Sequence, residues 1–476
     1  MTMDRLPSEL LHMICLILDQ SNLEGYSRWR PTYSLRPLCL TSRRLCAIAQ
    51  PVIYRTIRLR TGEQYENLLN TFCTKPELAK AVTNVVFFEQ ERYAPRHRQV
   101  ATRLKDQSAK HLAGDAVVSK ALVDTYLCRL WTAVHKTQPH SAQAWDWYEG
   151  AARDAALNLV ALLHFLPNVS LCKFVGRPLV NGPGPRRPSY SDLPRGEPTN
   201  ATAFQEILSA ISRALDDPVS HDLGGNPFAK IQRLYFMNLS FPLRGPMLRA
   251  ATALPKMHAL CLESVSNVEY FTPLPPTPLT STIRELRMYV TKTPKIPDPP
   301  WTTALKAFDR LEIFHYDHFP SSFSSPDEFA ATMAAIESQR ESLREVSISI
   351  DLGTAWSGEY PKRHNISAYS WASYPELAVL KVPDILLYGD HRGPIDLNAS
   401  PGLPRRIEAL TLQNVWPTSK IDLLLEKIIP VTGQVPDLKQ ISVLSVESWR
   451  DSPPRSFDCT VNKLESHGIT VKFCDF

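Results

Sequence analysis

The spacing of apolar residues near the start of the chain predicts a helix with two apolar faces. From Leu10 to Leu18 every residue except His12 is apolar, and Pro7 suits the first turn of a helix because its missing N–H would be unpaired there. An ordinary surface helix carries one apolar stripe. The face that we expect to pack internally consists of Leu10, Ile14 and Ile17. The second face, which needs another cover, consists of Leu11, Cys15 and Leu18.

A shorter helix and a strand are predicted before residue 60. Thr41 or Ser42 can cap a helix whose apolar side includes Leu45, and Pro51 is expected to end it. The segment TIRLR alternates apolar and polar residues, which predicts a strand. Exposing the second face of the first helix would forgo about 1.5–3 kcal/mol per side chain. Either the rest of the chain or a partner protein should therefore cover that face.

Further along the chain, an apolar template Φ-x-x-Φ-x-Φ recurs, where Φ is an apolar residue. The central Φ positions are Cys172, Leu234, Leu260, Leu286, Leu311, Val346, Leu380, Leu410 and Ile441. VTNVVF (82–87) is a candidate early copy. The separations from Leu234 to Leu311 are 26, 26 and 25 residues, a period typical of leucine-rich repeats. The longer separations elsewhere indicate insertions.

These patterns predict an α/β protein in which a small helical module precedes an irregular leucine-rich-repeat solenoid. We expect the module over residues 1–60 and the solenoid over 61–476, with a parallel sheet on the concave side. Helices are predicted at 204–215, 329–336 and 421–429, a helical insert near 89–165, and a mobile loop at 176–200. The alternative is a set of unrelated α/β domains.

The composition indicates where in the cell the protein is found and how its charge is distributed along the chain. Nine cysteines include no C-x-x-C pair, which favours reduced thiols inside a cell. No apolar run reaches the roughly 18–20 residues of a membrane-spanning helix, so we expect a soluble intracellular protein, in the cytoplasm or nucleus. The net charge is +5, but residues 25–60 contain eight arginines and no acid. Such a basic surface can serve an acidic protein or nucleic acid.

The sequence contains no motif that predicts catalysis. The phosphate-binding, nucleophile-elbow and zinc-protease patterns are all missing. His315 and His318 form H-x-x-H without a surrounding acid or cysteine set, and His315 occupies a position predicted to point inward. We therefore expect no catalytic residues, no metal and no cofactor. An enzyme with an unfamiliar fold remains the weakest alternative.

The first sixty residues resemble the F-box motif, most closely that of fungal F-box proteins with irregular leucine-rich repeats. The resemblance comprises Leu6-Pro7-x-Glu9-Leu10-Leu11, Leu35-x-x-Leu38, TSRRL and PVIYRTIRL, although the link at 22–34 is longer than usual. It implies a module that docks on the Skp-type adaptor of a Skp–cullin–F-box ubiquitin ligase, while the remainder recruits a protein substrate. The adaptor-binding residues that it implies are Leu6, Pro7, Leu10, Leu11, Ile14 and Leu38.

A target-binding patch is predicted on the strand positions that alternate with the Φ residues and face the concave side. The residues concerned are Tyr235, Met237, Arg287, Tyr289, Phe314 and Tyr316, which are types enriched at protein interfaces. Alternatively, a loop or the segment after Ile441 covers this patch as internal packing. Because the arginine cluster coincides with the F-box-like module, whose adaptor is acidic, we expect it to assist protein docking rather than bind nucleic acid. The alternative function is a repeat scaffold without a ubiquitin role, and co-purification with the adaptor discriminates the two.

Overall fold

The protein consists of two compact units, one covering residues 1–236 with 254–257 and the other covering 237–253 with 258–476. The computed structural model describes residues 6–20, 35–59, 64, 67–68, 71–72, 74–88, 162–163, 166–175, 228–237, 254–263, 282–290, 305, 308–318, 326–350, 369–383, 386–387, 402–415, 421–445 and 458–475. The predicted loop 176–200, the predicted helix 204–215 and almost all of the insert near 89–165 lie outside the described residues.

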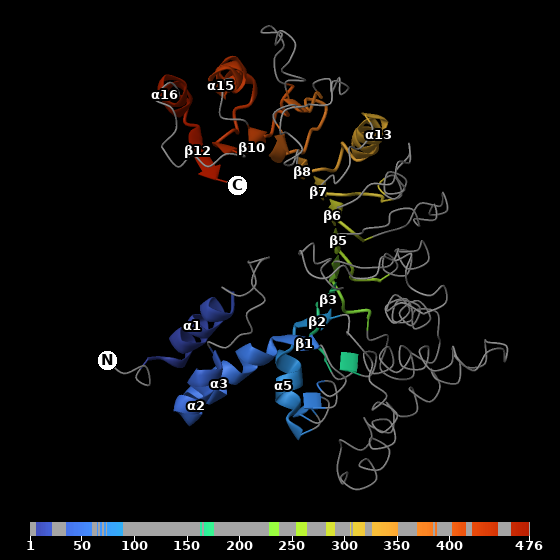
Figure 1. The fold of residues 1–476 in the computed structure, drawn as a ribbon, viewed down its shortest axis with the longest axis vertical. Helices are drawn as coiled ribbons and strands as arrows, with labels where there is room; N and C mark the ends of the chain where they lie inside the picture. Colours follow the sequence, from blue (N-terminus) through green and yellow to red (C-terminus); the bar gives the residue numbers. More distant parts are fainter. Residues whose placement is uncertain are drawn as a thin grey trace, which may run out of the picture. The chain divides into compact units, whose positions relative to one another are not determined.

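The first unit opens with three helices, α1 (Ser8–Gln20), α2 (Leu35–Thr41) and α3 (Arg43–Tyr54) (Figure 1). Ser42 is the N-cap of α3, and its Oγ accepts a hydrogen bond from the Leu45 amide at 3.1 Å. Arg44 on α3 donates from Nη2 to the carbonyl oxygen of Leu6 at 2.7 Å. This bond ties the start of α1 to α3, so the helices form one module.

Pro51 does not end α3, contrary to the sequence-based expectation. The helix continues to Tyr54, with Pro51 inside it. A proline removes only its own N–H from the helical hydrogen bonds, and later residues keep theirs. Val52 is 2% exposed in the module core, and burying it offsets part of the cost of the lost bond.

The first unit continues into a parallel sheet whose strands follow one another in sequence order. Its elements are β1 (Thr56–Leu59), α5 (Pro76–Ala81), β2 (Asn84–Phe88), β3 (Leu171–Val175) and β4 (Arg233–Met237). Three phenylalanines, Phe87, Phe174 and Phe236, stack along the core with ring centroids 5.2 and 5.4 Å apart. The predicted strand TIRLR and the early template copy are confirmed as β1 and β2.

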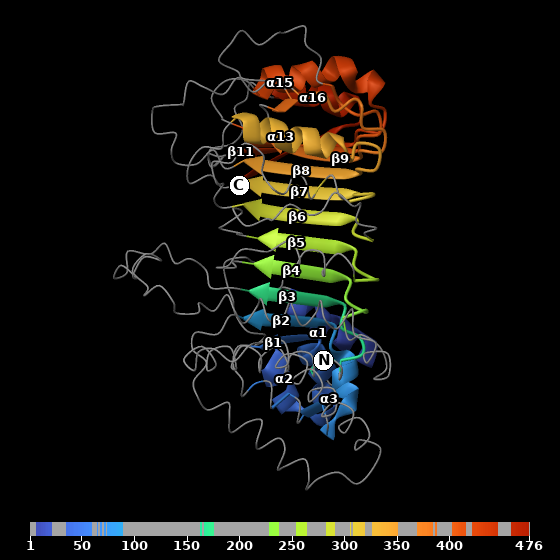
Figure 2. The same cartoon turned by 90° about the vertical axis from the view of Figure 1, so that its right-hand side faces the viewer.

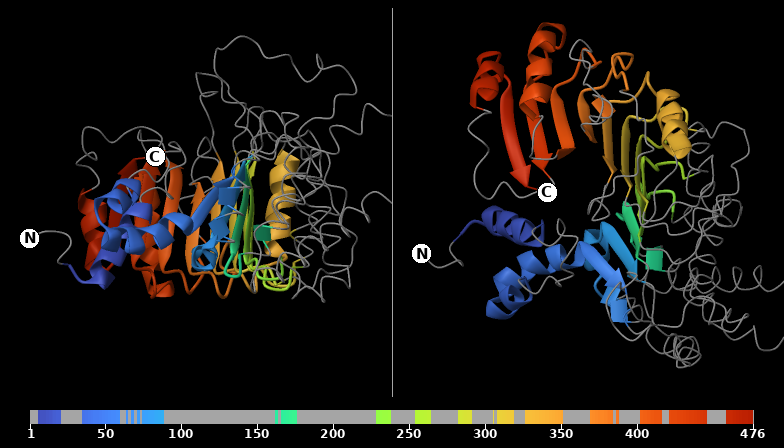
Figure 3. Two further views of the ribbon diagram at one scale, coloured as in Figure 1. Left: turned by 90° about the horizontal axis from the view of Figure 1, so that it is seen from below. Right: turned by 45° about the horizontal axis from the view of Figure 1, so that its top comes forward.

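The described residues of the second unit form eight parallel strands, which also follow one another in sequence order (Figure 2). They are β5 (Ala259–Glu263), β6 (Glu285–Val290), β7 (Ile313–His318), β8 (Glu345–Ile350), β9 (Val379–Pro383), β10 (Ala409–Val415), β11 (Gln440–Ser445) and β12 (Thr470–Asp475). The helices are α13 (Pro326–Glu337), α15 (Ile421–Ile428), the 3₁₀ helix η4 (Ile429–Gln434) and α16 (Asp458–Ser466). Figure 3 shows α13, α15 and α16 on one side of the sheet.

The core of the second unit lies between that side of the sheet and the helices. One column along the sheet pairs from strand to strand and consists of buried Leu260, Leu286, Phe314, Val346, Leu380, Leu410 and Ile441 and of partly buried Val471. The expected parallel repeat solenoid and the helices at 329–336 and 421–429 are confirmed. Strand β12, centred on Val471, is an additional repeat that the template did not identify.

The predicted position of one strand is wrong. The template placed Leu311 in the central column, whereas Leu286 pairs with Phe314. An offset of three residues, like any odd offset, exchanges the two faces of a strand. Phe314 and Tyr316, 0% and 3% exposed, therefore belong to the core rather than to the predicted target-binding patch.

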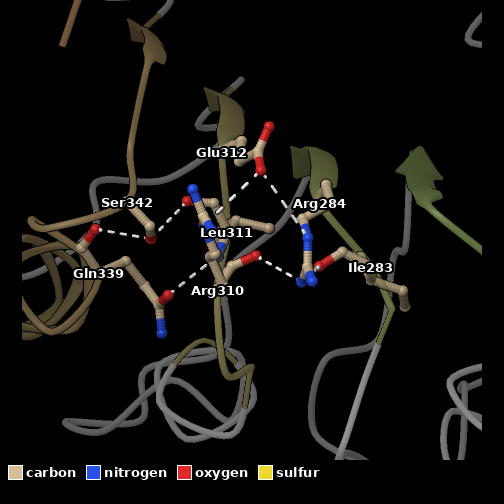
Figure 4. Close-up of polar contacts among 7 residues, drawn as sticks. All are labelled: Ile283, Arg284, Arg310, Leu311, Glu312, Gln339 and Ser342. Atoms are coloured by element: carbon tan, nitrogen blue, oxygen red, sulfur yellow. Dashed lines mark hydrogen bonds and ion pairs between the residues drawn. The ribbon is translucent and has the colours of Figure 1, made fainter. Parts of the chain in front are cut away.

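A buried glutamine fixes the turn that leads into β7 (Figure 4). Gln339 is 6% exposed and lies after α13. Its Nε2 donates to the carbonyl oxygens of Leu305 and Phe308 at 3.0 and 2.7 Å. Its Oε1 accepts a hydrogen bond from the Leu311 N–H at 3.1 Å. Ser342 Oγ also donates to the Leu311 carbonyl at 2.7 Å. These bonds satisfy backbone groups that no strand would pair, and they determine where β7 begins.

Candidate protein-docking surfaces

Helix α1 has one buried apolar side and one exposed apolar side, and the two are opposite to those expected. Leu11 and Cys15 are 1% and 2% exposed, whereas Leu10, Met13 and Ile17 are 46%, 56% and 61% exposed. Cys15 packs with Leu35, Ala49 and Val52 in the module core. The exposed residues Leu10, Met13 and Ile17, here called the apolar row, follow i, i+3, i+7 spacing and so share one side of the helix.

The apolar row is unusual within the part of the chain that the structure describes. Its three residues and Leu40, which is 89% exposed on α2, are the large hydrophobic side chains exposed among the described residues. Isolated exposed apolar residues are common, but several at helical spacing mark an interaction surface. The exposed residues Arg36, Arg43 and Arg44 on α2 and α3 add positive charge to the same module.

The six residues implied by the F-box resemblance occupy different environments. Pro7 and Leu10 are exposed, and Leu6, Ile14 and Leu38 are partly buried, so these five can reach a partner. Leu11 is inside the module, and its side chain is not at the surface. Met13, Ile17 and Leu40 were missed, because the sequence alone does not show which side of an almost wholly apolar helix faces its neighbours.

A second surface is formed by the sheet face opposite α13, α15 and α16, here called the polar face. Its side chains alternate with the core residues along each strand. Charged and polar residues from four adjacent strands, β6 to β9, meet there. This polar cluster consists of Glu285, Arg287, His315, Asp317, Glu345 and Lys381.

Ion pairs connect most of the polar cluster. Arg287 Nε donates to Glu285 Oε1 on the same strand. Glu345 Oε1 accepts from His315 Nε2 and from Lys381 Nζ, both at 2.9 Å. The hydrogen bond from His315 is the main reason why the pKa of Glu345 is lowered to about 2, with Lys381 contributing further. Glu345 is therefore ionised at neutral pH and joins three strands.

Asp317 has the opposite electrostatic behaviour. Burial raises the pKa of its carboxyl group to about 6, although the charges of His315, Arg287 and Lys381 act to lower it. Desolvation penalises the ionised form, and here it outweighs the three nearby bases. A carboxylate with a raised pKa in a cluster of charges is a candidate binding group.

The predicted target-binding residues are only partly brought together. Tyr235, Arg287 and Tyr289 are partly buried residues of β4 and β6, and Lys173 Nζ lies 5.9 Å from the centre of the Tyr235 ring. Met237 is 4% exposed and therefore contributes little surface. His315, which was expected to point inward, instead belongs to the polar cluster, because the correct β7 register moves it to the other face.

Other kinds of site find no support in the described ranges. These residues include no group of three or more His, Cys, Asp or Glu side chains able to hold a metal ion. None of the described helices is both long and apolar enough to cross a membrane. No family model, curated protein or solved structure matches the chain.

Proposed function

We propose that this protein is a substrate-recruiting subunit of a Skp–cullin–F-box ubiquitin ligase. In this proposal the helical module binds a Skp-type adaptor, and the repeat sheet binds a protein target. The protein performs no bond chemistry itself. It holds the target near the conjugating enzyme, which raises the effective concentration of the target there.

The exposed apolar row of α1 is the observation that carries the proposal. Three large side chains at 46–61% exposure would each gain up to about 1.5–3 kcal/mol on complete burial. Helices that expose such a row typically lie in a partner's apolar groove. The F-box resemblance names the partner, and the exposed arginines of α2 and α3 suit an acidic adaptor.

The test is co-purification of the full chain with a Skp-type adaptor. Ile17→Asp should abolish adaptor binding, because a carboxylate would be placed in a dry apolar contact. Its matched control is His12→Asp, which adds the same charge to an exposed position of α1 about 120° from the apolar row. The control should bind the adaptor normally.

The alternative function, a repeat scaffold without a ubiquitin role, is an outcome of the same test. If the wild-type chain fails to retain the adaptor, or if Ile17→Asp retains it as well as His12→Asp does, the ubiquitin-ligase proposal is wrong. Circular dichroism of both variants excludes misfolding. Leu11→Asp would not be informative, since its side chain is buried in the module core.

A further inference from the structure

Asp317 is the carboxylate of the polar cluster that lacks a partner. Glu285 binds Arg287, and Glu345 binds both His315 and Lys381. Among the described residues, no hydrogen bond or ion pair reaches the Asp317 carboxylate. Asp317 is therefore the carboxylate of the cluster without a hydrogen-bonded base, since the other two carboxylates are paired.

Asp317 lies on the polar face, and its neighbours on that face are residues of the adjacent strands. In the strand register it lies between Tyr289 on β6 and Ser349 on β8. Adjacent strands are about 4.8 Å apart, so the Tyr289 ring can contact a group that approaches Asp317. Aromatic rings attract cations over their faces.

We propose that the polar face of the second unit binds a protein segment that presents an arginine or lysine side chain to Asp317, with Tyr289 beside it. This inference rests on the proposed function, because it gives the chemical character of the target. A cation from the partner would form the ion pair that Asp317 lacks. An acidic segment would meet an unpaired carboxylate, and the cations that could attract it are already held by Glu285 and Glu345.

The electrostatics of Asp317 distinguish a binding role from a structural one. A carboxyl group whose pKa is raised by burial destabilises the folded state once it ionises. The free protein should therefore become more stable at pH 7 when Asp317 is changed to asparagine. A residue that held the sheet together would give the opposite result. Arg287, His315 and Lys381 are the bases facing Asp317, and Glu345 is the nearest acid on β8.

The experiment follows the titration of Asp317 in the full chain labelled with ¹³C at aspartate carboxyl carbons. The signal is assigned by its loss in Asp317→Asn. The probe is acetyl-Gly-Arg-Gly-amide, added until the signal stops changing, and its neutral counterpart is acetyl-Gly-citrulline-Gly-amide. The arginine probe should lower the titration midpoint by at least about one pH unit, which corresponds to tenfold tighter binding to the ionised carboxylate. The citrulline probe should leave the midpoint unchanged.

A matched variant, Asp309→Asn, alters an exposed aspartate in the turn before β7. It should keep the full response to the arginine probe at Asp317. An unchanged midpoint with the arginine probe, or equal shifts with both probes, would overturn the inference. So would a loss of stability in Asp317→Asn at pH 7. None of these measurements involves the adaptor, so failure here leaves adaptor docking intact, and failure of adaptor docking does not affect the probe result.

Discussion

We expect Gln339→Ala to destabilise the second unit by about 3 kcal/mol. The side chain makes three hydrogen bonds in a buried site, two to carbonyl oxygens and one from the Leu311 amide. A typical buried hydrogen bond contributes about 1 kcal/mol net. The Leu305 carbonyl keeps a second hydrogen bond, from the Phe308 N–H at 3.3 Å, so it loses less than the other two groups. Water entering the space would reduce the loss, whereas a dry space would increase it.

Two comparison variants separate hydrogen bonding from other effects. Gln339→Met keeps the volume of the side chain but removes all three bonds, so it should lose nearly as much stability as alanine. Arg340→Ala removes exposed ion pairs to Glu337 and Glu341, which are worth at most about 0.5 kcal/mol at such exposure.

Urea unfolding of the full chain and hydrogen exchange of residues 305–318 would check this prediction. Exchange is needed because a repeat protein can unfold in parts rather than in one step. The Leu311 amide should exchange much faster in Gln339→Ala than in the wild type. If Gln339→Ala and Arg340→Ala differ by less than 1 kcal/mol, or the Leu311 amide stays equally protected, the glutamine does not fix this turn.

Three further predictions concern pH and packing. Between pH 2 and 4.5 the free energy of unfolding should rise as Glu345 ionises, because its pKa is lowered in the folded state, and between pH 3.8 and 6 it should fall as Asp317 ionises, because the pKa of Asp317 is raised. Each change should be about 1–2 kcal/mol after solvent screening. Urea unfolding measured over this pH range checks both effects, and a decline that persists in Asp317→Asn would contradict the second. Gly402→Ala should cost about 1–3 kcal/mol, because an added Cβ would lie 3.0 Å from Ser370 Cβ and 3.1 Å from its Cα; an unchanged melting temperature would show that this segment can shift. Leu11→Asp should unfold the helical module by placing a carboxylate in its core, which loss of amide protection in α1 would reveal, and native-like protection would refute.

The sequence allowed most of the strands to be placed because each contains the same short apolar template, whose copies are 25–26 residues apart from Leu234 to Leu311. It failed at β7 because Phe308, Leu311 and Phe314 are spaced by three residues each, so two overlapping segments satisfy the same template. Only the pairing of Leu286 with Phe314 selects between them. That single ambiguity moved two aromatics onto the wrong face and hid His315 from the charged cluster.

The buried side of α1 was predicted wrongly for a different reason. An apolar residue on α1 is compatible with either side of the helix, and the choice depends on where Leu35, Ala49 and Val52 lie in space. Those positions follow from packing, not from spacing along α1. The unpaired state of Asp317 was equally inaccessible, because it depends on which bases the glutamates of neighbouring strands already hold.

The sequential order of the strands also shapes how the chain can fold. Paired central residues such as Ile441 and Val471 are 30 positions apart, so a strand can dock on one that left the ribosome shortly before it. Sheets built from such near neighbours are expected to form faster than sandwiches built from distant segments. The pair Val85 and Cys172 is much farther apart, at 87 positions, against 28 for Ile57 and Val85. Chain-length scaling makes its closure costlier by about 1 kcal/mol, and we expect the joining of β2 to β3 to be the slow step in assembling the first unit.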